Sequence, residues 1–470
     1  MTDPALRSEP ITCLYAQEGQ AVDLPNGLNV GDVDVENLGT FTVAPGKGQV
    51  RGPGQPPART ELRLYAGWGV GIQALPLMPS AGRPTLTVLV LPKGVDSDDE
   101  QGRWSALARF SQLIALGHGA EPRVEPVWGA ALGAAERFLL VFSTQLLQAA
   151  KEIVARHQRR HYRDEEMVFV GRIRGRPLVA RHVQLALRGE AHRIPCRFQE
   201  FDFDNPDNRL IKSALRRLAT IAAVLAPGGK LTRQLRAAAD AFVDVSDDCD
   251  VTADLSHARF HRISLPYRNA FAWARLVHRG AEAADGTAGA GAFWLDAPTV
   301  FEWFVERVAQ RAFPDDDVGL QDKRPGVFKG GPGTSRPGAR PDLVLSRQGR
   351  VFAIGDAKYK DVCETVQASG GCPVPFDTVI AAVSAADTYQ LYTYLRLANC
   401  GTGFFVVPFW DPKAGPVAVD ASFVFHRSPL DGEVGGTAFA FGLNLALSPV
   451  DVLLHGEIRL RECIGPPAAS

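Results

Sequence analysis

The sequence predicts an α/β protein in which a β-rich N-terminal domain and a mostly helical middle region precede a C-terminal mixed sheet flanked by helices. Three observations support this fold class. Short apolar runs broken by Gly and Pro dominate the start of the chain, which is typical of strands and loops. Apolar residues at helical spacing dominate the middle. After a Gly- and Ala-rich boundary at 281–292, the order helix, hairpin, helix, strand favours a mixed sheet.

Length and composition limit the class of protein. With 470 residues the chain is too long for one ordinary domain, so we expect two or three. Its 46% hydrophobic and 22% charged residues are normal for a globular protein. No apolar run approaches a membrane span and no apolar segment follows the first basic residue, which predicts a protein that is not secreted and has no membrane partner. Seven scattered cysteines without a CxxC pair indicate reduced thiols, so we expect a cytoplasmic protein.

The first predicted domain, residues 1–165, begins with strands and continues with helices. The segments 62–72 and 85–91 have the composition of strands, whereas the Gly/Pro-rich segment 45–57 is typical of a loop. Apolar residues then keep helical spacing from 104 to 114 and from 139 to 154. We interpret this domain as a module that binds a partner.

The middle region, residues 166–285, contains a predicted helix with apolar positions from 210 to 222. It ends at Pro227-Gly228-Gly229, because such a sequence cannot continue a helix. Either Asp207 or Asn208 is suited to cap its start.

This region is also basic. Residues 151–220 hold sixteen Lys and Arg against nine Asp and Glu. The excess suggests contact with phosphate or with an acidic partner, although solvated helix faces produce the same pattern. We therefore consider Arg172, Arg174, Arg209 and Lys212 either as contacts with DNA or a partner protein, or as solvated charges.

The C-terminal part is divided at residue 410. Residues 286–410 contain a predicted helix at 301–312 and a hairpin around Gln348-Gly349, followed by a helix at 387–394 and a buried strand at 404–407. Long Gly/Pro-rich loops are expected at 324–340 and 364–380. Residues 411–470 alternate short β-like runs with turns, and we interpret them as a β-rich extension.

Two aspartates and a lysine are predicted to converge on this hairpin. Side chains alternate along a strand, so Asp356 and Lys358 share one face. A three-residue loop with Gly349 at positive φ would pair Asp342 with Asp356. Carboxylates are ligands for a hard divalent cation, and a fixed ammonium beside them suits hydrolysis of a phosphodiester. The alternative is a solvated ion pair at the end of a strand.

These residues resemble the PD-(D/E)xK nuclease signature at Asp342, Asp356 and Lys358. Gln390 and Tyr394 are similar to the QxxxY helix that some members place after it, and positions four apart share a helix face. The resemblance implies that Glu302 contributes a carboxylate from the preceding helix. Glu302 as an exposed residue, and Gln390 and Tyr394 as core hydrogen-bonding groups, are equally compatible with the sequence.

A narrower resemblance is to McrC-type proteins, the nuclease subunits of modification-dependent restriction systems. It rests on Gly171-Arg172-Ile173, the segments 201–204 and 208–215, and the nuclease-like segments 356–359 and 387–394. A fainter likeness lies in Trp68-Gly69-Val70-Gly71 with Leu91-Pro92-Lys93. Gly355 departs from the family pattern, since a bulkier aliphatic residue is usual there.

The resemblance implies a catalytic set, a metal and partners. Asp342, Asp356, Lys358, Gln390 and Tyr394 would be catalytic, and Mg²⁺ (or Mn²⁺) would bind to Asp342, Asp356, Glu302 and the carbonyl of Ala357. The substrate would be double-stranded DNA, cut with the help of a GTP-hydrolysing AAA+ motor of the McrB type that this chain stimulates. No GxxxxGK[ST] motif is present, so nucleotide hydrolysis is expected from the partner. A double-strand break would require two nuclease domains to meet.

Two alternatives remain at the level of the sequence. One is a scaffold and GTPase activator that retains an idle nuclease fold. The other is a stand-alone repair nuclease with RecB-like chemistry, which leaves the central region around Asn208-Arg209 without a role.

Overall fold

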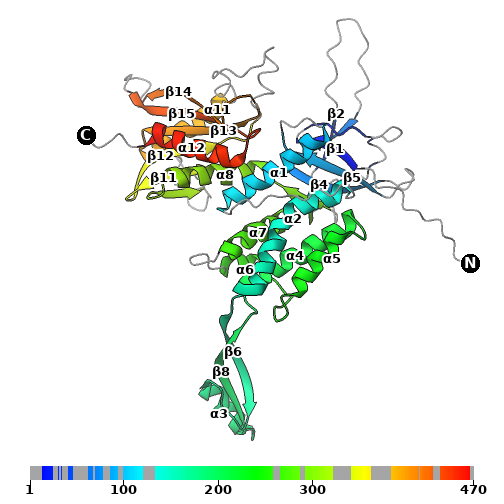
Figure 1. Cartoon of the computed structure of the whole chain (residues 1–470). Helices are drawn as coiled ribbons and strands as arrows, with labels where there is room; N and C mark the ends of the chain where they lie inside the picture. Colours follow the sequence, from blue (N-terminus) through cyan, green and yellow to red (C-terminus); the bar gives the residue numbers. More distant parts are fainter. Residues whose placement is uncertain are drawn as a thin grey trace, which may run out of the picture. The chain divides into compact units, whose positions relative to one another are not determined.

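The computed structural model describes residues 13–18, 20–24, 30, 33, 41–45, 62–66, 69–77, 85–93, 99–119, 133–257, 265–285, 292–320, 340–360, 383–411, 413–426 and 434–465. The chain divides into two compact units (Figure 1). Unit 1 comprises Met1–Val141 and Gly280–Ser470, and unit 2 comprises Phe142–Arg279. Unit 2 is thus an insertion into unit 1 along the sequence, and the domain boundaries expected at 165, 285 and 410 stay predictions.

The N-terminal part of unit 1 is β-rich, as expected. Its four-stranded sheet has the order β1 (Cys13–Gln17), β5 (Thr85–Leu91), β4 (Val70–Pro76) and β9 (Ala292–Leu295). A two-stranded sheet pairs β2 (Thr42–Pro45) with β3 (Leu62–Tyr65). Helix α1 (Glu100–Gly117) belongs to this unit, whereas α2 (Ala134–Glu152) begins in unit 1 and ends in unit 2, where a π-helical turn at Ile153–His157 follows it. Both helices confirm the helical spacing in the sequence. The loop expected at 45–57 lies outside the described residues beyond Pro45.

Strand β9 explains why the first unit is discontinuous in sequence. In the sequence it follows unit 2 and precedes the C-terminal part of the chain, yet it pairs antiparallel with β4. Trp294 lies directly on β4, where a Cβ added to Gly71 would lie 2.5 Å from Cε3 of Trp294. A Cβ added to Gly69 would lie 2.4 Å from Nε1 of the same tryptophan. The two glycines therefore make room for this tryptophan.

The C-terminal part of unit 1 contains a six-stranded mixed sheet. Its order is β10 (Asp317–Leu320), β11 (Leu343–Arg347), β12 (Arg350–Ala357), β13 (Thr402–Phe409), β15 (Val434–Asn444) and β14 (Val417–His426). Strands β12, β13 and β15 run parallel, and the other neighbours are antiparallel. The segment 411–470 therefore completes this sheet and adds a helix, α12 (Pro449–Ile464), which the sequence reading missed.

Helices flank this sheet, which confirms the expected architecture (Figure 1). Helix α11 (Ala385–Ala398) packs on β12 and β13 through a cluster that contains Ile354, Leu391 and Phe405. Helix α8 (Ala297–Ala312) packs against α1, α12, β10 and β12. The loops expected at 324–340 and 364–380 lie almost entirely outside the described residues.

The hairpin β11–β12 has the expected register but reaches it by a different route. Leu343 pairs with Gly355, which aligns Asp342 with Asp356. The turn has two residues and not three, since Gln348 (φ 50°) and Gly349 (φ 77°) are both left-handed. A bulge after Leu345 supplies the extra residue, because Leu345 pairs with Ala353 and Ser346 with Val351.

Unit 2 combines helices with a small β-arm. The helices are α4 (Pro206–Leu225), α5 (Lys230–Asp240), α6 (Val251–His257) and α7 (Leu265–Asp285). Helix α4 is capped by Asn205, whose side chain accepts from the Asn208 N–H at 3.0 Å, and not by Asp207 or Asn208. Pro206 at the first helical position fixes this start. The arm comprises β6 (His161–Val170), β7 (Arg176–Pro177), α3 (Val179–Leu187) and β8 (Arg193–Asp202).

One described helix, Ala134–His157 with a mean hydropathy of 1.3, is long and apolar enough to cross a membrane by length and composition alone. This differs from the expectation that no such run exists. Of its most apolar window, 56% is buried within the protein, as is usual for a core helix. Burial of Phe138, Phe142 and Leu146 accounts for the composition.

Phe404 on the neighbouring strand occupies the space above Gly355, the position where the resemblance implies a bulkier aliphatic residue. A Cβ added at Gly355 would lie 2.3 Å from Cζ of Phe404. We predict that Gly355→Ala lowers the free energy of unfolding of unit 1 by about 1–3 kcal/mol through overpacking. Adding Phe404→Leu should recover part of this loss. Urea titration followed by hydrogen exchange in β12 and β13 measures both effects.

Gly415→Ala is the matched control, because no atom lies within 4 Å of its added Cβ. We expect a change within about 0.5 kcal/mol there. Equal losses for Gly355→Ala and Gly415→Ala would contradict the role of Phe404.

Candidate active site

The two predicted aspartates lie next to each other at one end of the β11–β12 hairpin. Asp342 immediately precedes β11, and its Oδ2 accepts a hydrogen bond from the Ala357 N–H at 2.9 Å. Asp356 lies near the end of β12 and is 1% exposed. The hairpin therefore places both carboxylates at the same edge, as the alternation of side chains predicts.

Lys358 completes this group and is tied to helix α11. Its Nζ lies 2.7 Å from Asp356 Oδ2 and donates to Gln390 Oε1 at 3.2 Å. Gln390 Nε2 in turn donates to the Tyr394 hydroxyl at 2.7 Å. That hydroxyl donates to the carbonyl of Arg340 at 3.3 Å, on the segment that leads to Asp342. All five residues predicted as catalytic thus belong to one connected arrangement.

The structure adds two charged residues that the sequence reading did not assign. Asp387, at the start of α11, forms an ion pair with Lys360 and lies 3.8 Å from Lys358 Nζ. Its carboxylate also accepts from Ser384 in a capping box. The spacing of Ser384 and Asp387 is a signal for such a box and could have located this carboxylate.

Burial and charge set the ionisation of this group. Burial, together with the adjacent Asp342, raises the pKa of Asp356 to about 7, and Lys358 opposes this shift. Burial alone would lower the pKa of Lys358, but Asp356, then Asp342 and Asp387, raise it above its usual value. Lys358 therefore carries a charge that its neighbours stabilise, whereas ionised Asp356 needs a further cation.

The residues present fit a divalent cation. Within the described part of the chain, neither carboxylate oxygen of Asp356 accepts a well-formed hydrogen bond, apart from the ion pair with Lys358. Asp342 supplies a second carboxylate, and oxygen donors of this kind suit Mg²⁺ or Mn²⁺. The described residues contain no cluster of three His, Cys, Asp or Glu side chains, so ligation by Glu302 on α8 and by the Ala357 carbonyl stays a prediction.

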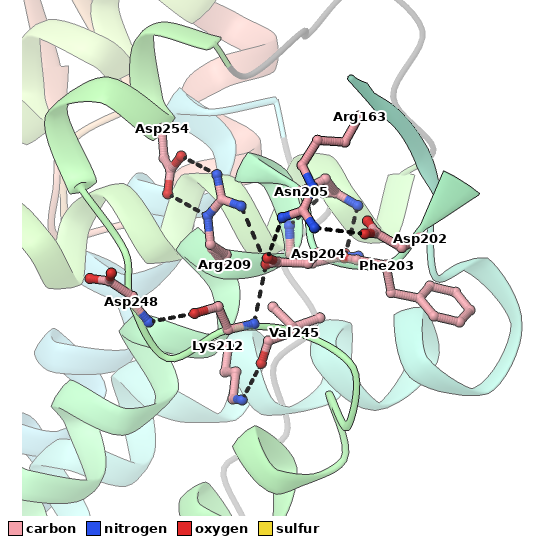
Figure 2. Close-up of polar contacts among 12 residues, drawn as sticks. Arg163, Asp202, Phe203, Asp204, Asn205, Arg209, Lys212, Val245, Asp248 and Asp254 are labelled. Carbon is pink, nitrogen blue, oxygen red and sulfur yellow. Dashed lines mark hydrogen bonds and ion pairs between the residues drawn. The ribbon is translucent and has the colours of Figure 1, made fainter. Parts of the chain in front are cut away.

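Arg209 and Lys212 are engaged inside unit 2 (Figure 2). Arg209 forms a two-pronged contact with Asp254, with distances of 3.0 and 2.7 Å, and a third contact with Asp204 at 3.3 Å. Lys212 is buried and donates to the carbonyl of Val245 at 2.6 Å. These contacts join α4 to α6 and to the loop before it, so each side chain has a structural task. Their contact with DNA or a partner stays a prediction.

Arg172 and Arg174 lie in the turn of the arm. Arg172 lies over the ring of Phe169 at 5.1 Å, and Arg174 over the ring of Phe198 at 4.0 Å. Arg174 also donates to Glu200 at 3.3 Å. The two rings form the small core of the arm with Cys196, so these arginines cover that core and leave their charged ends exposed.

A comparison with known protein families identifies a match over most of the chain. A family model described as "McrBC 5-methylcytosine restriction system component" matches residues 81–408, well over half of the chain. The chain belongs to the McrBC family. The predicted resemblance to McrC-type proteins is thereby confirmed at the level of the family. No curated protein matches the sequence.

Two solved structures resemble the McrBC-family chain. One is a "Refined half-complex from tetradecameric assembly of Thermococcus gammatolerans McrB AAA+ hexamers with bound McrC". It has 19% identity and a TM-score of 0.43, over 85% of this chain and 83% of that one. The other, a "Cryo-EM structure of the Thermococcus gammatolerans McrBC complex", has 17% identity and a TM-score of 0.42, over 64% of this chain and 88% of that one.

The buried carboxylate of Asp356 generates a prediction about stability. Asp356→Asn should lower the thermal midpoint of the metal-free protein, because it breaks the buried 2.7 Å ion pair with Lys358 and leaves that ammonium without its nearest carboxylate. The same change should abolish stabilisation by Mg²⁺. For wild type that stabilisation would be about 1.4 kcal/mol when Mg²⁺ exceeds its Kd tenfold. Differential scanning calorimetry with EDTA or with Mg²⁺ measures both.

Asp317→Asn is the control, since Asp317 is an exposed aspartate in β10 of the same sheet. It should keep the response to Mg²⁺. A response of equal size in Asp356→Asn would exclude this carboxylate as a ligand.

Proposed function

We propose that this McrBC-family chain is a Mg²⁺-dependent DNA endonuclease subunit of a restriction complex. It would cleave foreign, modified DNA together with a GTP-hydrolysing AAA+ motor, whose hydrolysis it stimulates. The observation that carries the proposal is the convergence of Asp342, Asp356 and Lys358 at one edge of a mixed sheet, in the PD-(D/E)xK pattern. A complete set of these residues favours an active nuclease over an idle fold.

The side chains present support hydrolysis of a phosphodiester. Bound Mg²⁺ would polarise the scissile phosphate and lower the pKa of a water. Lys358 would hold the attacking water and offset negative charge as it develops on the phosphate. Gln390 fixes the ammonium of Lys358 from one side and the hydroxyl of Tyr394 from the other, which restricts the rotamers of all three. One such centre cuts one strand, so a double-strand break would require two nuclease domains.

Membership of the McrBC family and the absence of a P-loop motif from the sequence support a motor that is a separate protein and hydrolyses the nucleotide. The arm of unit 2 is the surface best suited to bind it. Helix α3 has no buried residue, and Val179, Val183 and Leu187 are 69%, 50% and 83% exposed. These residues are four apart and so form one apolar stripe along the helix. An apolar stripe on a protruding module is typical of a docking surface for another protein.

The charges on the arm support a selective contact. Arg181 and Arg197 are both paired with Glu166, at 2.8 and 2.5 Å, and stay within the arm. Arg172 forms no ion pair within the described residues and contacts the ring of Phe169. An arginine of this kind at the tip could approach a nucleotide phosphate of the motor, which is one physical way to stimulate hydrolysis.

The nuclease proposal predicts that Asp356→Ala and Lys358→Ala each reduce DNA cleavage by roughly 10²-fold or more. Stimulation of the motor should stay at the wild-type level, because the arm is unchanged. Cleavage of 5-methylcytosine DNA and GTP hydrolysis are measured in parallel with the chain purified together with its AAA+ partner. Lys413→Ala, at an exposed lysine in a loop of the same unit, should cut like wild type.

Wild-type cleavage by Asp356→Ala would exclude the nuclease role of this centre. Cleavage of the same DNA without the motor would instead favour a stand-alone nuclease.

The docking proposal predicts that Val183→Glu with Leu187→Glu weakens binding of the motor at least about tenfold, since charges would be placed in an apolar contact. Stimulation of GTP hydrolysis should fall with it. Both side chains are exposed in this chain, so its thermal midpoint should change little. Biolayer interferometry measures the affinity. Gln184→Glu, on the same helix but outside the stripe, should bind normally, and equal binding by the double variant would refute the docking surface.

A further inference from the structure

Unit 1 contains a pocket at the carboxyl ends of the three parallel strands of the mixed sheet. Tyr359 follows β12, Trp410 follows β13 and Leu445 follows β15, and all three line it. Helix α1 contributes Arg109, and the segment after β5 contributes Lys93. The pocket has about 300 Å³ of space, part of it open to solvent. Ligands of open α/β sheets bind at this edge of the strands.

Arg109 gives this pocket its chemistry. It is half-buried and forms no hydrogen bond or ion pair with the described residues. Burial lowers the pKa of its guanidinium, and among the described residues no carboxylate offsets this. None of the residues that line the pocket is acidic, and Lys93 adds a second cationic side chain. A half-buried charge without a partner is costly, which indicates that an anion completes the site.

The walls of the pocket fit a nucleic acid. The rings of Tyr359 and Trp410 lie edge to face, with centroids 6.1 Å apart at 88°. Aromatic side chains of this kind contact sugars and bases, while arginine binds phosphate through two parallel hydrogen bonds. Tyr359 also directly follows Lys358, so one strand end supplies both the reacting centre and a wall of the pocket.

We propose that Arg109 and this pocket bind a backbone phosphate of the DNA strand that is cleaved at the Asp342–Asp356–Lys358 centre. The inference rests on the proposed nuclease function and adds a DNA-binding site to it. Lys358 and Tyr359 are consecutive, and they contact different helices: Lys358 contacts Gln390 of α11, and Tyr359 contacts Phe301 of α8. A strand that passes over this edge presents neighbouring phosphates to both.

The test is the salt dependence of DNA binding. Fluorescence anisotropy with a short 5-methylcytosine duplex, without divalent metal, compares the wild-type full chain with Arg109→Gln and Arg109→Lys. Loss of one phosphate contact should weaken binding about tenfold and reduce the slope of log K against log salt by about 0.9. Arg109→Lys should keep the slope, because it keeps the charge. Circular dichroism melts confirm that each variant is folded.

Arg103→Gln is the matched control, because Arg103 lies on the same helix but stacks over Tyr15 at 4.1 Å. It should bind DNA as wild type does. An unchanged slope for Arg109→Gln would overturn the proposal. A second outcome would also overturn it. If inorganic phosphate or GTP raises the thermal midpoint of wild type but not of Arg109→Gln, and both bind DNA equally, the pocket binds a free anion and not DNA. Equal cleavage by wild type and Asp356→Ala would refute the proposed nuclease centre. The salt dependence of DNA binding would still show whether Arg109 contacts a phosphate.

Discussion

The buried ion pair between Asp356 and Lys358 is the constraint on which the C-terminal half of unit 1 depends. A carboxylate with 1% exposure on a central strand is unfavourable unless charge and hydrogen bonds surround it. Helix α11 therefore combines two tasks. Leu391 and Leu395 pack on the sheet, while Asp387 and Gln390 on the same helix reach the ammonium of Lys358. The capping box at Ser384 fixes where this helix begins and so holds its polar groups in register with β12.

The site was predictable from sequence because its geometry is local. Alternation along β12 places Asp356 and Lys358 on one face, and a helical spacing of four aligns Gln390 with Tyr394. The hairpin was harder. The turn differs from the expected one in two ways whose effects on the register cancel. Its loop has one residue fewer than expected, and the bulge after Leu345 adds one residue to the hairpin. No local pattern specifies a bulge, so the correct pairing of Asp342 was reached from an incorrect turn.

The division into two units could not be read from composition, because it depends on pairings between distant segments. Four residues at 292–295 join β4 more than two hundred positions earlier, and β15 inserts between β13 and β14. Counting charged residues in the sequence also does not show which of them are buried. Lys212 belongs to the basic excess of the middle region, yet it is buried against the carbonyl of Val245. A net charge describes a surface only when the side chains reach it.

The arm of unit 2, in contrast, has few internal contacts. Its core is a few residues around Phe169 and Phe198, and α3 is a nine-residue helix without a side-chain cap. Isolated helices of this length are marginal in water, and burial of an apolar face normally stabilises them. Here that face is exposed. The apolar residues at Val179, Val183 and Leu187 contribute little to the fold of the chain alone, and the motor contact proposed above would bury them. The two carboxylates and the lysine at the end of β12 are held by contacts within the chain, whereas the apolar face of α3 is the surface that the proposed motor contact would cover.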